Sequence, residues 1–171
     1  MNVLRAQHKG FTLIEILIVI GIIAILAAVV IVAINPARQF AKANNGQRSS
    51  NINTILNAVH QFSVDKKGTL PPAVAALSVG VSAAICNTTG ATCTATLVID
   101  LGTDTNLDLA NQTYIASMPI DPSCPASCSE TDFNQGSSDI STGYRIYRSA
   151  NNRITVYAPG AQLGEPMSVT R

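Results

Sequence analysis

The stretch KGFTLIEILIVIGIIAILAAVVIVAIN, Lys9–Asn35, decides the fold of this chain of 171 residues. Residues 16–34 include no charged side chain, and their number is close to the about 20 that a helix needs to cross a bilayer. The run is longer than the apolar part of a secretory signal peptide, about 7–15 residues. Helical sequence also continues beyond it. We therefore expect a membrane-spanning helix that the mature protein retains.

One acid, Glu15, lies near the start of this apolar run. An ionised carboxylate in hydrocarbon is unfavourable, so an acid inside a membrane segment is by default a candidate functional residue. The alternative is that Glu15 lies at the level of the lipid headgroups without a special role. A short basic leader with Arg5 and Lys9 ends at an abrupt polar-to-apolar junction, Gly10–Phe11. Cleavage there would create an α-amine with a pKa near ~8. If helices stack with a stagger of about one turn, that amine would pair with Glu15 of the next subunit.

The helical pattern continues past Pro36 as an amphipathic helix. Its apolar stripe has the spacing of one helix face and comprises Ile52, Ile55, Leu56, Val59 and Phe62. Polar residues are expected on the other faces, namely Asn51, Asn53, Asn57 and Gln61, with His60 solvated beside them. A single helix over residues 11–62 would be ~78 Å long, far more than in a usual globular domain. Pro36 predicts a kink or partial break near the end of the apolar run.

The second half of the chain predicts short strands separated by turn residues. Tyr144–Ser149 and Arg153–Ala158 flank an Ala-Asn-Asn sequence and predict an antiparallel hairpin. Ala95–Leu101 and Thr113–Met118 are further predicted strands, and Met167–Thr170 adds a last one. An antiparallel sheet that packs on the amphipathic helix would bury the apolar stripe. The predicted fold class is therefore α+β.

Four cysteines, Cys86, Cys93, Cys124 and Cys128, all lie in the polar half of the chain. An even number at short spacings favours disulfides in an oxidising compartment. Proximity alone suggests the pairs Cys86–Cys93 and Cys124–Cys128. A zinc site with four thiolates is the alternative, but neither pair has the Cys-x2-Cys spacing typical of such sites. Disulfides would place this half of the chain outside the cytoplasm.

The junction Lys9-Gly10-Phe11-Thr12-Leu13-Ile14-Glu15, followed by the long apolar run, resembles the type IV filament proteins, which are the type IV pilins and the pseudopilins of type II secretion. The resemblance implies cleavage after Gly10 by a membrane aspartic prepilin peptidase and methylation of the new Phe11 amine. It implies that Glu15 acts in subunit docking. It also implies that an assembly platform and its ATPase extract subunits from the bacterial inner membrane, where the N-terminus is cytoplasmic, into a helical homo-oligomeric filament at the cell surface.

The resemblance predicts four segments. Residues 1–10 are a leader that is removed, and residues 11–35 form the transmembrane and filament-core helix. Residues 36–66 form the amphipathic helix of the globular domain, and residues 67–171 form a loop-rich β-sheet head with disulfides.

The branch of the family remains open between a pilin, a pseudopilin, and a minor pilin for DNA uptake or adhesion. Met118–Pro122, MPIDP, resembles the Leu-Pro-x-Asp-Pro segment of major pseudopilins, where the following loop binds calcium. Glu130, Asp132 and Asp139 offer oxygen ligands in the corresponding loop. The alternative, a solvated acidic loop without metal, is favoured because the spacing matches no known calcium loop.

The remaining composition argues against other classes of function. The net charge is +1, without the clustered Lys and Arg or the aromatic platform that nucleic-acid binding requires. We recognise no catalytic constellation and no cofactor motif in the sequence. A structural protein, and not an enzyme, is therefore expected.

Overall fold

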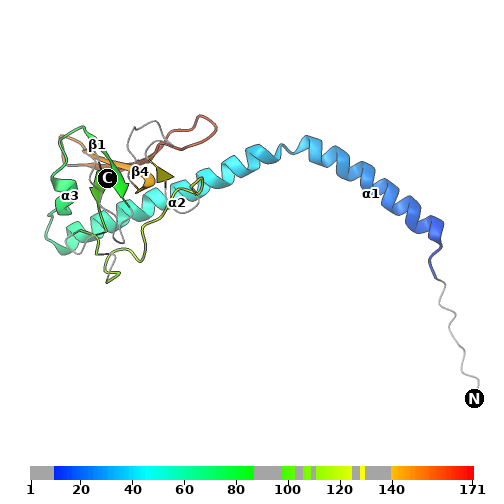
Figure 1. The fold of residues 1–171 in the computed structure, drawn as a ribbon, viewed down its shortest axis with the longest axis horizontal. Coiled ribbons are helices and arrows are strands. Elements are labelled where there is room, and N and C mark those ends of the chain that lie inside the picture. The colour runs from blue at the N-terminus through cyan, green and yellow to red at the C-terminus, as the bar shows by residue number, and fades with distance from the viewer. Residues whose placement is uncertain (1–9, 87–97, 103–105, 109–110, 125–127, 130–139) are drawn as a thin grey trace, which may run out of the picture. The chain divides into compact units, whose positions relative to one another are not determined.

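The computed structural model describes residues 10–86, 98–102, 106–108, 111–124, 128–129 and 140–171 (Figure 1). The chain divides into two compact units, Met1–Gln39 and Phe40–Arg171. The first unit contains helix α1, Leu13–Ala33, and the first residues of helix α2, Pro36–Asp65. The second unit contains the rest of α2, the short helix α3, Pro72–Ala75, and a β-sheet.

Helix α1 is apolar on all sides. Its 21 residues extend ~31 Å, and none of them is buried. Among the described residues it is the one helix long and apolar enough to cross a membrane. After Ala33 the backbone of Ile34 is extended (φ −96°, ψ 96°), and α2 begins at Pro36. The helix is thus interrupted just before the proline, where the ring disfavours helical backbone in the preceding residue.

Helix α2 is amphipathic along its second half, as its spacing predicts. All five residues of the predicted apolar stripe are buried, with exposed fractions of 5% or less. The helix ends where Lys67 and Gly68 adopt positive φ angles of 55° and 91°. The Gly68 amide donates to the Ser63 carbonyl at 2.7 Å, which satisfies one of the free carbonyls at the helix end.

The described strands form one sheet in the order β2-β1-β4-β5-β6, with β3 paired to β4. The strands are β1 Ser82–Cys86, β2 Val98–Asp100, β3 Cys128–Ser129, β4 Ile140–Arg148, β5 Ile154–Ala158 and β6 Met167–Thr170. Neighbouring strands pair antiparallel except β1 and β2, which are parallel. The sheet is therefore mixed and not wholly antiparallel as expected.

The predicted hairpin and last strand are confirmed as β4, β5 and β6. Asn152 has a φ of 57° and donates its amide to the Ser149 carbonyl at 3.0 Å, which closes the turn. Of the strand predicted at residues 95–101, Val98–Asp100 forms β2, and residues 95–97 lie outside the described part.

The prediction of a strand at Thr113–Met118 is wrong. This segment is irregular, because the Asp108 carboxylate accepts hydrogen bonds from the Thr113 hydroxyl at 2.7 Å and from the Asn111 side chain. Ile115 and Met118 are nevertheless buried in the core. The apolar residues of this segment are thus explained by the burial of a loop and not by strand pairing.

Helix α2 and the sheet share a single hydrophobic cluster. Ile52, Leu56 and Val59 from the helix lie in it together with Ile146 and Val156 from the sheet. The α+β arrangement predicted from the sequence is confirmed for this unit.

Candidate functional site

The first candidate site is the start of α1. Thr12 is the N-cap residue, and its hydroxyl accepts a hydrogen bond from the Glu15 amide at 3.3 Å. The backbone of Thr12 is extended (φ −82°, ψ 151°), so regular helix begins only at Leu13. Gly10 and Phe11 therefore precede the helix, and the Phe11 side chain is 79% exposed. The predicted cleavage junction lies in accessible, non-helical chain.

Gly10 has no structural requirement for glycine within this chain. A Cβ atom added there would meet no other atom within 4 Å. Contacts within the described chain therefore do not require glycine at this position.

Glu15 lies in the first turn of α1, one turn from the junction. The carboxylate has no ion-pair partner among the residues that the structure describes. Its position near the positive end of the helix dipole is favourable, but this effect is only about 0.3–1 kcal/mol. Where this end of the helix is buried in lipid or protein, the ionised carboxylate would be stabilised by a cation.

The apolar side chains of α1 have no partner within the described chain. Leu13, Ile25 and Leu26 are 83%, 67% and 61% exposed, and at 3.6 residues per turn they lie on three different sides of the helix. A helix that is apolar on every side is stable only in lipid or among other helices. The exposed side chains of this element are therefore suited to apolar surroundings.

A second cluster, which the sequence reasoning missed, lies on the first part of the buried face of α2. The Arg48 guanidinium forms a bidentate ion pair with the Asp121 carboxylate, at 2.7 Å from Nε and 2.8 Å from Nη2. Both side chains have an exposed fraction of 0%. Nη2 also donates to the Ser123 hydroxyl at 2.6 Å, and Nη1 donates to Asn45 Oδ1 at 3.1 Å. The charges are thus compensated and hydrogen-bonded in the interior.

Two neutral side chains extend this cluster to other segments. The Asn51 amide donates to the Tyr144 hydroxyl of β4 at 2.8 Å, and burial raises the pKa of Tyr144 to about 12. The Asn45 side-chain amide donates to the Gln162 carbonyl at 2.8 Å, and Asn45 Oδ1 accepts a bond from the Gln162 amide at 3.0 Å. The expectation that Asn51 lies on a solvated face is therefore wrong, because its amide is paired with a buried phenol.

His60 is not solvated as expected, since it is half-buried and its Nε2 atom is buried without a hydrogen-bond partner in the described part of the chain. Burial and the nearby Arg171 charge both lower the pKa of His60. Sequence periodicity could not indicate this effect of Arg171 on His60, because Arg171 lies far away along the chain.

The cysteines and the calcium candidates are only partly described. Cys86 and Cys124 are each disulfide-bonded. Cys93 lies outside the described residues, and so does the side chain of Cys128. The two proposed pairings therefore stay predictions. The calcium candidates Glu130, Asp132 and Asp139 also lie outside the described residues.

No group of three or more potential metal ligands is found in the described part. Asp121, the acid of the MPIDP segment, is engaged by Arg48 and by the Ser123 amide at 2.8 Å. Its carboxylate oxygens are therefore occupied by protein donors.

Comparison with known proteins identifies one family motif and one relative. Residues 5–31 match the prokaryotic N-terminal methylation motif. Over 81 residues the chain is 38% identical to the type IV wide pilus major component PilA4 of Thermus thermophilus. The matched region comprises 47% of this chain and 60% of the relative. The chain thus matches less than two thirds of that relative's length. No solved structure matches the chain.

Proposed function

We propose that the chain is a member of the type IV pilin and pseudopilin family and the structural subunit of a type IV pilus-like surface filament, which the methylation motif and the type IV pilus relative support. The observation that carries the proposal is α1, a 21-residue helix with no buried residue and a single acid, which lies one turn from an accessible Gly10–Phe11 junction. Such a helix requires lipid before assembly and like helices afterwards.

The proposed assembly proceeds from the inner membrane, with the N-terminus cytoplasmic. A prepilin peptidase cleaves after Gly10, and the new Phe11 amine is methylated. The amine of one subunit then pairs with Glu15 of its neighbour and fixes the stagger between them. An assembly platform and its ATPase draw the subunit into a helical filament on the cell surface. Helix α1 forms the filament core, and the sheet coats it. No catalytic role and no cofactor are part of this proposal.

A pilin is favoured over a pseudopilin by the relative, whose name describes it as the major component of a wide pilus. The pseudopilin alternative drew support from the MPIDP segment. That support is weaker because Asp121 is bound to Arg48. A minor pilin for DNA uptake or adhesion is the remaining alternative. Electron microscopy of fractions sheared from the cell surface distinguishes long surface fibres from short periplasmic ones.

The charge-pairing step is tested with Glu15→Gln, which keeps the shape of the side chain and removes its charge. We expect the variant to enter the membrane and to be cleaved normally, while fibres are lost by at least tenfold. The matched control is Glu165→Gln, because Glu165 is an exposed acid in the second unit. Normal fibre yield from Glu15→Gln would overturn the pairing argument. N-terminal mass spectrometry monitors cleavage in the same samples.

The cleavage step is tested separately with Gly10→Val. We expect the unprocessed chain to accumulate in the membrane with its leader attached. The fold of the second unit should be unaffected, since position 10 lies in open space. Detection of Phe11 as the mature N-terminus of this variant would contradict the assignment of the junction.

A further inference from the structure

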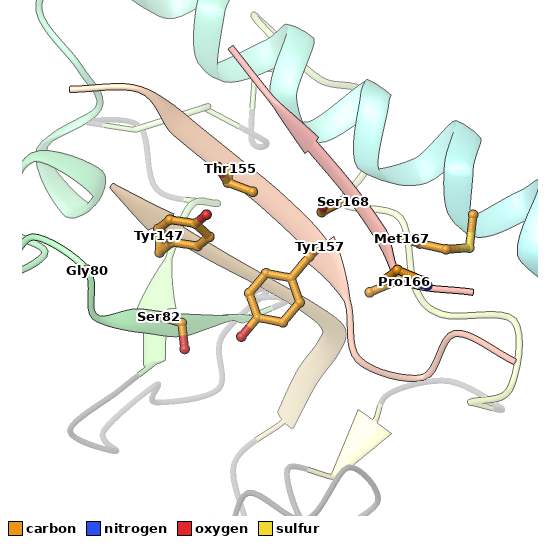
Figure 2. Close-up of a pocket in the computed structure, with 9 residues that line it drawn as sticks. Gly80, Ser82, Tyr147, Thr155, Tyr157, Pro166, Met167 and Ser168 are labelled. Carbon is orange, nitrogen blue, oxygen red and sulfur yellow. The ribbon is translucent and has the colours of Figure 1, made fainter. Parts of the chain in front are cut away.

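Two rows of side chains run across the sheet on the face opposite to the hydrophobic core. In the first row, Ser82 pairs with Tyr147 and Tyr147 pairs with Thr155. In the second row, Tyr157 pairs with Ser168 of the edge strand β6. Because strand side chains alternate, these residues lie opposite to the core residues between them. Figure 2 shows the two tyrosines and Ser82 close together on this face.

These rows line a groove of about 490 Å³, whose lining also includes Gly80 and Pro166 (Figure 2). Its volume lies within the range of about 300–1,000 Å³ that is typical of small-ligand sites. The rings of Tyr147 and Tyr157 meet edge to face, with centroids 6.4 Å apart, and both remain half-exposed. The groove therefore has a preformed aromatic wall.

Several hydroxyl groups around this wall are available to a ligand. The hydroxyls of Tyr147, Tyr157 and Ser168 have no hydrogen-bond partner in the part of the chain that the structure describes. The Ser82 hydroxyl accepts a bond from Arg145 Nε at 3.3 Å, so its own proton is free to donate. Thr155 is different, since its hydroxyl is already bonded to Thr170 at 2.8 Å.

None of the described residues that line the groove is charged, and the neighbouring cation Arg145 is buried beside Tyr157 and bonded to Ser82. A nucleic acid would need cations along its phosphates, so the lining does not suit one. A proline-rich peptide would pack on tyrosine rings and accept bonds from the hydroxyls, but it would leave the acceptor capacity of those hydroxyls unused. Four hydroxyls that can both donate and accept fit a ligand whose own groups do the same.

We propose that this groove binds a neutral saccharide. The apolar C–H face of a pyranose ring packs on the Tyr157 ring, and the sugar hydroxyls bond to those of Tyr147, Ser168 and Ser82. One shallow site of this size gives a Kd on the order of 1 mM. The proposal does not depend on the filament role, because the groove belongs to the second unit and Phe11 and Glu15 to the first.

The test uses the full chain in detergent and a panel of uncharged disaccharides, namely lactose, maltose and cellobiose. Saturation-transfer NMR detects weak binding, and quenching of tyrosine emission follows it directly because the chain has no tryptophan. We expect saturable binding of at least one sugar. Tyr157→Ala should weaken it by at least about tenfold, whereas Tyr157→Phe should retain most of it because the ring remains.

A second variant and a control keep the test decisive if Tyr157→Ala fails to fold. Ser168→Phe places a ring over the groove from an exposed position of β6 and should block binding. Phe40→Ala removes a 71% exposed aromatic ring from α2 and should leave binding unchanged. No saturable binding by the wild type, or equal binding by the wild type and Ser168→Phe, would overturn the proposal. Binding of a proline-rich peptide in place of every sugar would overturn it too.

Discussion

At the scale of single residues, the Arg48–Asp121 pair joins α2 to the segment around Asp121. The two charges bond each other in bidentate geometry, the Asn45 and Ser123 side-chain oxygens accept further bonds from Arg48, and the Ser123 amide donates to Asp121. Removing only one partner from such a pair leaves an uncompensated buried charge, which is far more destabilising than removing both. The pair therefore holds the segment that leads to Cys124 against α2.

The buried ion pair predicts that the effects of substituting Arg48 and Asp121 on the free energy of unfolding are strongly non-additive. Asp121→Leu should lower the free energy of unfolding by about 3–5 kcal/mol, because the Arg48 charge stays buried and unpaired. The double variant Arg48→Met/Asp121→Leu should recover most of this loss. Chemical denaturation measures all three proteins. A double variant as unstable as the sum of the single ones would show that the two residues act independently.

His60 predicts a dependence of stability on pH. Its pKa in the folded protein lies below the ordinary 6.5, so the unfolded chain binds the proton first as the pH falls. The free energy of unfolding should therefore be highest above pH 6.5 and should decrease as the pH falls through 6.5 toward the lower folded value.

His60→Gln provides the comparison, since it keeps a polar side chain but cannot titrate in this range. We expect the difference in stability between wild type and variant to change between pH 7 and pH 5. A difference that stays constant over this interval would contradict the assignment. The imidazole resonances of His60, followed by NMR, give the folded pKa independently.

At the scale of elements, α2 is one helix with two kinds of buried face. Its first part buries the polar residues Asn45, Arg48 and Asn51, and its second part buries the apolar stripe that begins at Ile52. The polar part bonds to specific atoms of distant segments, whereas the apolar part packs on the sheet without such specificity. The first part thus determines the register of the helix on the sheet, and the second supplies most of the hydrophobic stabilisation.

The hydrophobic stabilisation by the second part of α2 is tested by replacing two of its valines, one buried and one exposed, with alanine. Val59 is 0% exposed and Val64 is 78% exposed. Val59→Ala should lower the free energy of unfolding by about 2 kcal/mol, from two lost methyl groups and a small cavity. Val64→Ala should change it by no more than about 0.5 kcal/mol. Thermal unfolding monitored by circular dichroism compares them, and similar effects would refute the burial of this face.

The elements that sequence reasoning predicted are those with a local signal. The apolar run of α1, the stripe of α2 and the hairpin around Asn152 are each contained in neighbouring residues. Strand β1 was missed because Ser-Ala-Ala-Ile-Cys has neither alternation nor β-branched residues beyond Ile85. The Arg48–Asp121 pair joins residues 73 apart in the chain, so no local pattern indicates it. The cleavage junction at Gly10–Phe11 stays a prediction, and it could be proposed from sequence because recognition by another protein requires a local motif.

At the scale of the whole molecule, the two units have opposite requirements. The first exposes an apolar helix that needs lipid or copies of itself, and the second has its own core and disulfide-bonded cysteines. Their stability should therefore respond to different treatments. Reduction acts on the second unit alone, since all four cysteines lie in it.

Reduction of the disulfides should lower the unfolding temperature of the second unit, because each lost disulfide costs about 2–4 kcal/mol. The helix signal of α1 in detergent should persist. Peptide mapping under non-reducing conditions should show Cys86 bound to Cys93 and Cys124 bound to Cys128. Other linkages would refute the pairing that proximity suggests.

The open space around Gly10 has a practical consequence. A Cβ atom at that position meets no neighbouring atom, so we expect a set of substitutions there to leave the fold of the described chain unchanged. The yield of processed protein from each substitution would then report the preferences of the proposed peptidase. Position 10 could serve as an assay for the specificity of that enzyme in living cells.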